Sequence, residues 1–512
     1  MFDTCQKSRQ SLNRAEYRDK VLGCWTGKNI GGTLGAPIEG RREMFDLTFY
    51  KQDLNGTPAP NDDLDLQLVW LQAAEERGVY QLNERVLGEY WMAHITGPWN
   101  EYGIGKANMA NGFQPPLSGA LNNGQWKNSN GAWIRSEIWA CLFPGSPDDV
   151  LEFAWYDSCV DHAGDGIYAE LFTAALESAA FVVQDIRRLI EIALSKIPAD
   201  CRVARSVKLA CREYDAGRSL TDARNAIVAD STDLGWFQAP ANVAFAILGL
   251  LYGEGDFGKS LCCAVNCGDD TDCTGATVGS VLGILLGRSG IPSKWSDPIG
   301  ESIQTVAINR FRLDVPATIS ELTDRVVRLA EETARWNPTL PGFTDDGGGF
   351  DAGYLAGLDS DKCARKRIWN RSSFAQTYPL PWGEITVTFE NEPQIATGES
   401  LKMCLSISPL VYDDKVVHLE WGLPEGWSAS PGEVFSMLTR MGQTQSIECE
   451  LTAGTFSGAV EYLPLTIRLA GRFNPLVVMV PIQQKGCANN EFPEVNQSYY
   501  DIRDRLLARR RG

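Results

Sequence analysis

One stretch of the sequence, residues 266–275 (NCGDDTDCTG), constrains the fold more than any other. It carries three aspartates between two runs of apolar and small residues, 261–265 and 276–286. These neighbours indicate that the acids lie near a core, where close carboxylates repel one another unless they are protonated or bind a cation. A cluster of oxygen ligands suits a hard cation such as Mg²⁺, Ca²⁺ or Mn²⁺. The alternative is a surface turn whose acids cap the helix that follows.

A second acidic segment, NDDLD at residues 61–65, precedes an apolar helical pattern that runs to Glu76. Asn61 or Asp62 is a natural N-cap, and acids in the first turn favour the positive end of the helix dipole. An N-cap accounts for one acid here but not for three, so we favour a metal site over a capping role. We expect four carboxylates of the two segments to converge on one metal site, namely those of Asp62, Asp63, Asp270 and Asp272.

Glycine recurs at every fourth position near the N-terminus, at residues 23, 27, 31 and 35. On a helix this spacing forms one stripe and lets another backbone approach closely. Glycine lowers helix propensity, so such a stripe needs a packing or ligand-binding reason. Pro37 then ends the helix, and Glu39 presents a carboxylate directly after it.

Residues 91–139 are rich in Trp, Asn and Gly. Aromatic rings beside amides and hydroxyls fit a sugar or nucleotide platform, and they fit core packing between helices equally well. On the first interpretation, Trp133 and the loop residues Ser118 and Gly119 contact the substrate. His162 lies at a helix junction beside acids, and its role is equally open between a ligand contact and a structural hydrogen bond.

Composition and charge narrow the class of protein. With 512 residues, the chain is long enough for two domains or more. Its net charge of −18 argues against nucleic-acid binding, and no run is long and apolar enough to span a membrane. The N-terminus lacks the apolar region of a signal peptide. We therefore expect a cytoplasmic protein whose 14 cysteines are free thiols.

The periodicity of the sequence changes after residues 1–336, which predict successive helices with short loops. Residues 337–377 are predicted to form a linker. From 378 to 485, alternating polar and apolar residues predict about seven strands and an immunoglobulin-like β-sandwich as an accessory domain. Residues 486–512 form an Arg-rich tail, predicted as a short solvated helix. Nine of the predicted helices span 147–160, 166–183, 184–197, 201–215, 220–229, 239–252, 256–265, 272–287 and 317–335.

Four segments occur in an order that resembles a known family. Residues 31–39 (GGTLGAPIE) are similar to the family motif G-D-A-L-G-x-P-x-E, and residues 61–64 (NDDL) to T-D-D-T. Residues 130–135 (NGAWIR) are similar to N-G-x-x-M-R, and residues 268–273 (GDDTDC) to G-G-D-T-D-T. Together these segments resemble the ADP-ribosylglycohydrolase family, which includes the dinitrogenase reductase-activating glycohydrolases.

The resemblance implies a multidomain protein whose all-α, orthogonally packed helical domain cleaves the bond between the anomeric ribose carbon of ADP-ribose and an acceptor. It also implies two divalent ions, usually Mg²⁺, at the centre of this domain, with Glu39 beside them. The implied metal ligands are Asp62, Asp63, Asp270 and Asp272, joined by the amide oxygen of Asn61. The implied cleft-lining residues are His162, Asn130 and Gly131.

Three positions lack a threonine hydroxyl of the family pattern: Asn61, Leu64 and Cys273. Asn61 still offers an amide oxygen, Leu64 offers no ligand, and a thiol at Cys273 is a poor ligand for Mg²⁺. The cysteines between 262 and 273 are not spaced as C-x-x-C and give only weak support for zinc. Gly32 replaces an aspartate and Asp269 a glycine, which suggests that one acid is exchanged for the other.

Hydrolysis at an anomeric carbon builds oxocarbenium character in the ring. Two bound cations would hold vicinal hydroxyls and activate a water, and Glu39, Asp63 or Asp270 would act as the general base. We therefore expect a metal-dependent hydrolase of an ADP-ribosyl or related glycosidic bond. Two alternatives stay open: a glycoside hydrolase for a carbohydrate or another N- or O-glycoside, and a catalytically silent ligand-binding protein. The expected partner is a small-molecule, glycan or ADP-ribosyl substrate, without nucleic acid or membrane, and the sequence indicates no oligomeric state.

Overall fold

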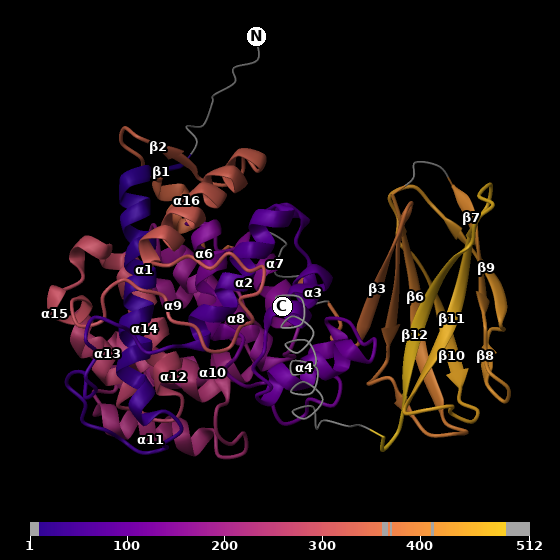
Figure 1. Ribbon diagram of the computed structural model, residues 1–512, viewed down its shortest axis with the longest axis horizontal. Coiled ribbons are helices and arrows are strands. Elements are labelled where there is room, and N and C mark those ends of the chain that lie inside the picture. The colour runs from indigo at the N-terminus through magenta and orange to yellow at the C-terminus, as the bar shows by residue number, and fades with distance from the viewer. Residues whose placement is uncertain (1–9, 361–366, 369–370, 411–413, 488–512) are drawn as a thin grey trace, which may run out of the picture. The chain divides into compact units, whose positions relative to one another are not determined.

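The computed structural model describes residues 10–360, 367–368, 371–410 and 414–487, and Figure 1 shows its helices and strands. The chain divides into two compact units, each formed from more than one segment. The first unit draws on the described parts of Met1–Gly97, Trp126–Ser158 and His162–Asn370. The second unit draws on the described parts of Pro98–Gln125, Cys159–Asp161 and Arg371–Gly512. The predicted helix of the Arg-rich tail lies outside the described residues.

The first unit is built from helices, apart from β1 (Ser11–Asn13) and β2 (Gly342–Thr344), which pair in parallel. The α-helices of this unit are α1 (Arg14–Gly35), α2 (Asp62–Arg77), α3 (Glu84–His94), α6 (Glu137–Leu142), α7 (Val150–Ser158), α8 (Asp165–Ala180), α9 (Ile186–Ser195), α10 (Arg202–Asp215), α11 (Leu220–Asp230), α12 (Ala239–Gly253), α13 (Phe257–Val265), α14 (Thr271–Leu286), α15 (Ser293–Ser296), α16 (Ile319–Trp336) and α17 (Ala352–Ala356). Its 3-10 helices are η1 (Ala36–Ile38), η2 (Val79–Gln81), η3 (Trp133–Arg135) and η4 (Arg288–Gly290). All nine helices predicted between residues 147 and 335 are confirmed, each within three residues of the predicted boundaries.

Side-chain caps explain where several of these helices begin. Asp185 accepts a hydrogen bond from the backbone N–H of Arg188 (2.7 Å) at the start of α9. Asp256 accepts one from Lys259 (2.7 Å) at the start of α13 in the same way. Each such cap satisfies a backbone donor that the helix itself leaves unpaired and contributes about 1 kcal/mol.

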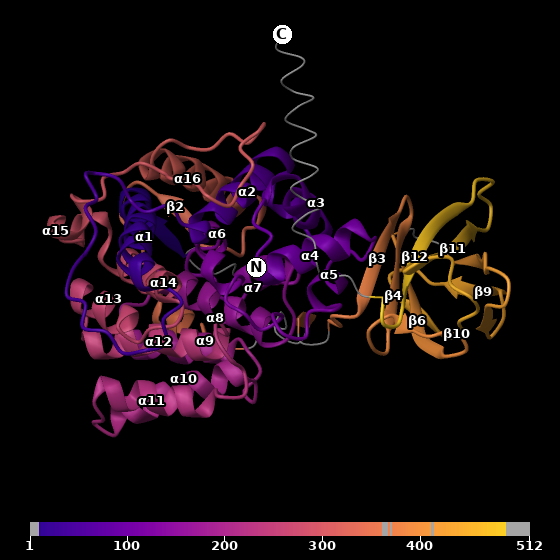
Figure 2. The ribbon, with the colours of Figure 1, turned by 60° about the horizontal axis from the view of Figure 1, so that its bottom comes forward.

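Helices α1 and α14 lie side by side and antiparallel, with their backbones in contact (Figures 1 and 2). A Cβ atom on Gly27 would lie 1.9 Å from the carbonyl oxygen of Gly279, and one on Gly31 would lie 1.9 Å from that of Gly275. No side chain fits between carbonyls at such distances. The glycine stripe of α1 is therefore a packing surface, as predicted, and its partner is the glycine row of α14.

The described residues of the second unit form two five-stranded sheets that share one hydrophobic core. The first sheet is antiparallel with the order β3 (Ala375–Leu380), β4 (Gly383–Phe389), β6 (Ser400–Pro409), β10 (Gln445–Thr452), β8 (Ser428–Ser430). The second has the order β5 (Gln394–Ile395), β12 (Leu476–Gln484), β11 (Val460–Leu469), β7 (Lys415–Trp421), β9 (Val434–Thr439), and its β5–β12 pair is parallel. A C-terminal β-region is thus confirmed, while its immunoglobulin-like type stays a prediction.

Two helices from the middle of the sequence, α4 (Asn100–Ala110) and α5 (Leu117–Ala120), belong to the second unit. Apolar side chains next to and within α5 join the core of the strands: Phe113, Leu117 and Leu121. Asn122 Nδ2 also donates to Gln483 Oε1 (2.9 Å) in β12. This segment is therefore a structural part of the β-rich unit.

Most aromatic rings of residues 91–139 are core residues. Trp91 and Trp139 have no exposed surface, and Phe113 is 1% exposed, whereas Trp99 is 45% exposed. These rings are covered by the protein, as the core-packing interpretation predicts. Among the described residues, no helix is long and apolar enough to cross a membrane.

Candidate metal centre

The candidate site forms where the first turn of α14 meets the last turn of α1. A Cβ atom on Gly35 would lie 2.2 Å from the carbonyl oxygen of Thr271, and Thr271 Oγ1 donates to the carbonyl oxygen of Gly35 (2.9 Å). This contact holds Glu39, which follows α1 by way of η1, beside the acids at the start of α14. Two overlapping groups of donor atoms result, each within 4.8 Å of one another: Glu39, Asp270 and Asp272 in the first, and Asp63, Asp272 and Cys273 in the second.

The first group is made of carboxylates alone. Asn130 Nδ2 donates to Asp270 Oδ2 (2.7 Å), and the backbone N–H of Asp270 donates to Asn242 Oδ1 (3.2 Å). These two bonds fix Asp270 in position. Asp270 and Asp272 are buried, whereas Glu39 is exposed, so this group has one face open to solvent.

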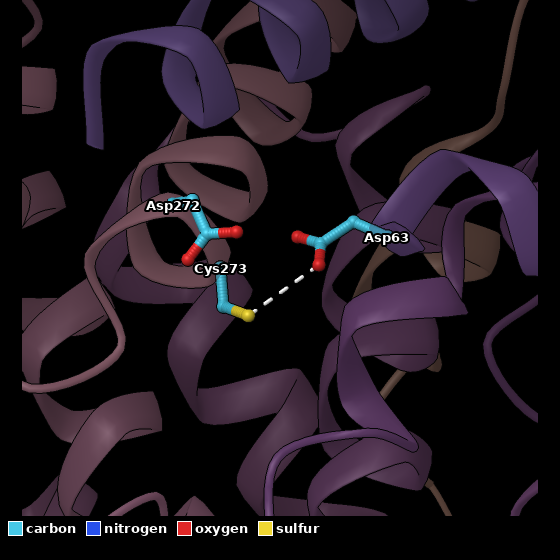
Figure 3. Close-up of side chains that lie close together, drawn as sticks. All are labelled: Asp63, Asp272 and Cys273. Carbon is cyan, nitrogen blue, oxygen red and sulfur yellow. Dashed lines mark hydrogen bonds between the residues drawn. The ribbon is translucent and has the colours of Figure 1, made fainter. Parts of the chain in front are cut away.

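The second group joins α2 to α14, as Figure 3 shows: Asp63, Asp272 and Cys273 point toward one another. Cys273 Sγ lies 3.4 Å from Asp63 Oδ1. Asn61 begins α2 by accepting a hydrogen bond from the N–H of Asp63 through Oδ1 (2.7 Å). Its amide nitrogen faces Asp272 Oδ2 at 3.5 Å. The oxygen of Asn61 that was predicted to bind metal is thus already an N-cap acceptor.

Burial raises the pKa of every carboxyl group in the two groups, and repulsion from neighbouring carboxylates raises it further for Glu39, Asp63 and Asp270. The charge of Asp272, followed by burial and the charge of Asp62, raises the pKa of Glu39 to about 8. Burial is the largest cause for Asp63 and Asp270, and each is raised further by Asp272. Asp62 itself belongs to neither group, although its charge reaches both Glu39 and Asp63. Such shifts show that the ionised carboxylates lack enough positive charge around them.

Two buried carboxylate oxygens of the centre have no hydrogen-bond partner among the described residues: Asp63 Oδ2 and Asp272 Oδ1. Asp63 is fully buried and Asp272 is 7% exposed. An unpartnered buried anion is costly unless a cation or proton compensates it. The donor atoms present therefore fit one or more divalent cations.

A buried ammonium group also reaches the centre from α1. Lys28 Nζ lies 4.0 Å from Asp63 Oδ2, and it donates to Glu137 Oε1 (2.7 Å) and to the carbonyl oxygen of Ile134 (2.7 Å). Although burial lowers the pKa of Lys28, the charges of Glu137 and Asp63 raise it overall. Lys28 was not among the residues predicted from the sequence. The available signal was a lysine beside the glycine stripe of α1, one residue after Gly27.

Two further acids of the predicted segments are structural. Asp65 Oδ2 accepts backbone N–H bonds from Val306 and Ala307 (2.6 Å each). Asp269 accepts from the N–H of Phe237 (3.1 Å) and pairs with Arg42 Nε (3.3 Å). The expected exchange of an acid at residue 32 for Asp269 is therefore wrong, since Asp269 lies in neither metal-binding group.

The other residues that were predicted to contact substrate make hydrogen bonds within the protein. Trp133 Nε1 donates to Asn130 Oδ1 (3.1 Å), so Trp133 reaches the centre through Asn130. His162 is fully buried with its Nε2 3.1 Å from Ser129 Oγ, and the carbonyl oxygen of Gly131 accepts from Arg135 (2.5 Å). In the second unit, Ser118 Oγ donates to the carbonyl oxygen of Val160 (2.6 Å), and the carbonyl oxygen of Gly119 accepts from Asn123 (2.8 Å). Their contacts with substrate stay a prediction.

The sequence profile of the ADP-ribosylglycohydrolase family matches residues 13–337, well over half of the chain. The chain belongs to the ADP-ribosylglycohydrolase family. The matched residues contain both acidic segments and all of α1 and α14, so the metal centre lies inside the family domain. The buried acidic groups are consistent with the metal binding typical of ADP-ribosylglycohydrolases.

A comparison with curated proteins found no match. Among solved structures, an "ADP-ribosylglycohydrolase-related protein complex" is similar at 18% identity with a TM-score of 0.42, covering 64% of this chain and 100% of that chain. The cupredoxin domain of amoB from Nitrosocaldus yellowstonii is similar at 14% identity with a TM-score of 0.16, covering 23% of this chain and 90% of that one. With TM-scores below 0.5, these similarities support no functional conclusion about this member of the family.

Proposed function

We propose that this ADP-ribosylglycohydrolase family member is a metal-dependent hydrolase that cleaves an ADP-ribosyl or closely related glycosidic bond at the anomeric ribose carbon. The observation that carries the proposal is the convergence of carboxylates from three separate segments, those of Glu39, Asp63 and the acids at 270 and 272. Two of their buried oxygens have no hydrogen-bond partner within the described part of the chain. A bound cation would compensate these buried oxygens, which accept no hydrogen bond from the described residues.

The residues of the centre have distinct chemical roles in such a reaction. Bound divalent cations would stabilise the charge that leaves the anomeric carbon and lower the pKa of a nearby water. Asp270 and Asp272 are buried and held in place, so they suit cation binding. Glu39 is the exposed carboxylate of its group, and in the proposed reaction it would accept a proton from water as the general base. Repulsion from Asp272 is the largest cause that raises the pKa of Glu39 to about 8. A cation bound by both carboxylates would offset this repulsion.

A surface feature next to Glu39 supports a nucleotide-containing substrate. The guanidinium of Arg42 lies 5.0 Å from the ring centroid of Trp236, which is 43% exposed. Arg42 also pairs with Asp269, and the N–H of Gly40 donates to the carbonyl oxygen of Asp269 (2.8 Å). The loop after Glu39 is thus tied to the residue before Asp270. An exposed indole beside a guanidinium fits an aromatic base and a phosphate better than a neutral sugar.

The two alternatives have less support. One feature that favours the carbohydrate hypothesis is the Trp-rich segment, and most of its rings are covered by the protein. A silent binding protein would have no need for buried carboxylates that repel one another, because their ionisation costs stability without a cation. The metal hydrolase accounts for both observations.

The test is a hydrolysis screen on the full-length protein with defined metal content. The substrates are peptides with N-linked or O-linked ADP-ribose, and aryl glycosides represent the carbohydrate alternative. We expect release of ADP-ribose that depends on a divalent cation and is lost with a chelator. Cation-independent release, or cleavage of the aryl glycosides alone, would overturn the proposal. A protein that binds ADP-ribose but turns over none of the substrates would instead be a silent binding protein.

A further inference from the structure

The two groups of the metal centre differ in the chemistry of their donors. Glu39, Asp270 and Asp272 offer oxygen alone, whereas the second group replaces one oxygen by the sulfur of Cys273. Cys273 is 5% exposed, and its Sγ faces Asp63 across the space between α2 and α14 (Figure 3). The sulfur is therefore part of the second group and not of the surrounding apolar core.

Two of the three side chains of the second group have a buried oxygen that accepts no hydrogen bond within the described part of the chain, although Lys28 Nζ lies 4.0 Å from that of Asp63. Asp63 Oδ2 and Asp272 Oδ1 are the buried oxygens without a hydrogen-bond partner among the described residues. Each belongs to a side chain that is more than nine-tenths buried and directed into the same space. Two carboxylates and a thiol within 4.8 Å of one another thus surround a place for one cation.

We propose that Asp63, Asp272 and Cys273 bind a thiophilic divalent ion of the zinc type, while the all-oxygen group binds a hard ion. This assignment rests on the proposed metal centre and specifies its second position. Zn²⁺ accepts sulfur and carboxylate oxygen together, and three protein ligands with one open position are typical of its catalytic sites. Mg²⁺ requires near-octahedral oxygen coordination and binds thiolate poorly. The donor set of the second group therefore does not fit the Mg²⁺ pair that the family resemblance implies.

The charges around the second group are compatible with this ion. Metal binding breaks the S–H bond of Cys273, forms a metal–sulfur bond, and releases the proton to solvent. The two carboxylates and the thiolate then carry one negative charge more than a divalent cation neutralises. Lys28, whose ammonium lies 4.0 Å from Asp63 Oδ2, offsets part of this excess. Asp272 belongs to both groups, so its carboxylate offers oxygen to both proposed ion positions.

Another nearby cysteine serves as a matched control. Cys267 is fully buried, but its Sγ donates to the carbonyl oxygen of Cys263 (3.3 Å) and it belongs to neither metal-binding group of the described residues. Cys267→Ser and Cys273→Ser make the same chemical change at two buried positions six residues apart. A difference between them therefore reports on coordination rather than on the loss of a buried thiol.

The experiment titrates the metal-free, full-length protein with Co²⁺ and records the near-ultraviolet spectrum. We expect a sulfur-to-cobalt charge-transfer band in the wild type and in Cys267→Ser, and no band in Cys273→Ser. X-ray absorption of the Zn²⁺-loaded protein should show one sulfur at about 2.3 Å. Competition with a chromophoric chelator should show that Cys273→Ser binds Zn²⁺ at least about 10-fold more weakly. A wild-type spectrum without the band, or a band that survives in Cys273→Ser, would overturn the assignment.

The outcomes also separate this inference from the proposed function. Hydrolysis with Mg²⁺ alone and no charge-transfer band would leave the hydrolase standing and reject the thiophilic position. A band that depends on Cys273 in a protein that hydrolyses no substrate would support the ion assignment and reject the hydrolase. Cys273→Thr restores an oxygen donor, so we expect its binding preference to shift from Zn²⁺ toward Mg²⁺ by at least about 10-fold. An unchanged preference would count against the role of the sulfur.

Discussion

Asn130 Nδ2 donates a hydrogen bond to Asp270 Oδ2 over 2.7 Å, and Trp133 in turn donates to Asn130 Oδ1. The indole thus orients the amide, and the amide orients the carboxylate. Asn130 is therefore a positioning residue for the metal centre.

Asn130→Ala should lower kcat/KM by about 10- to 100-fold and weaken cation binding, because hydrogen bonds to metal ligands have effects of this size. Trp133→Phe removes the hydrogen bond that supports Asn130, together with part of a buried ring, and should lower kcat/KM less than Asn130→Ala. Kinetics and metal titrations at fixed protein concentration measure both effects. If Asn130→Ala keeps wild-type metal affinity, the amide does not position Asp270.

Asp270→Asn and Asp272→Asn should each abolish hydrolysis, with rate losses of at least about 1,000-fold, while the fold survives. Each change removes a negative ligand and nearly conserves volume. The melting temperature of the metal-free variants should equal or exceed that of the wild type, since repulsion among the acids is relieved. Steady-state rates and thermal melts measure the two effects, and near-normal rates in these variants would contradict a metal hydrolase.

Asp269→Gly is the matched control for these variants. The residue has a φ of +70°, which glycine adopts more easily than aspartate, but its carboxylate also pairs with Arg42 and the N–H of Phe237. We expect a loss of activity far smaller than for Asp270→Asn, because Asp269 holds a loop and does not bind metal. A loss as large as that of Asp270→Asn would place Asp269 among the ligands.

The stability of the metal-free protein should fall as pH rises toward 8. The pKa of Glu39 is raised from an unfolded value of about 4.3 to about 8, so the folded state binds more protons than the unfolded state between these values. The free energy of unfolding therefore decreases with pH across this window. Saturating divalent cation should flatten the dependence, and so should Glu39→Gln. Thermal melts from pH 5 to pH 9 test this, and an unchanged slope in Glu39→Gln would show that another group titrates.

Gly27→Ala should destabilise the helical unit although alanine is the better helix former by about 1 kcal/mol. Its Cβ would lie 1.9 Å from the carbonyl oxygen of Gly279, so the two backbones must separate, at a cost of about 1–3 kcal/mol or more. Gly349→Ala is the control, because a Cβ there meets no atom within 4 Å. Denaturant unfolding of both variants measures the difference, and equal stabilities would show that α1 and α14 do not depend on this contact.

The sequence predicted the bounds of the helices more accurately than it predicted which helix or unit each one packs against. Apolar periodicity and caps such as Asp185 are local, so the helix boundaries could be predicted closely. The spacing of Gly27 and Gly31 predicted a close backbone contact, but period alone does not say which helix makes it. For the same reason α5 could not be assigned to the core of the strands, because its apolar side chains fit either unit.

The candidate site could be predicted only in part, because some of its residues are recognisable from local sequence and others are brought in by tertiary packing. The carboxylates at 63, 270 and 272 are recognisable as an unusual density of acids beside apolar runs, and the structure brings them together with Glu39. Lys28, in α1, and Asn130, in the loop before η3, reach the centre from segments distant in sequence, and tertiary packing decides that they meet Asp63 and Asp270. Asp65 and Asp269 look like ligands in the sequence and are structural acceptors, because backbone N–H groups from other segments reach them.

The contact between α1 and α14 consists of main-chain atoms, which every amino acid carries. The separation between Glu39 and the acids of α14 is set by these peptide groups together with the hydroxyl of Thr271, which donates to the carbonyl oxygen of Gly35. We expect a substitution at Leu64 or Cys273 to change the donor atoms offered to a cation and to leave the contact between α1 and α14 in place. The ion that the candidate centre accepts would then change while the spacing of its carboxylates is kept.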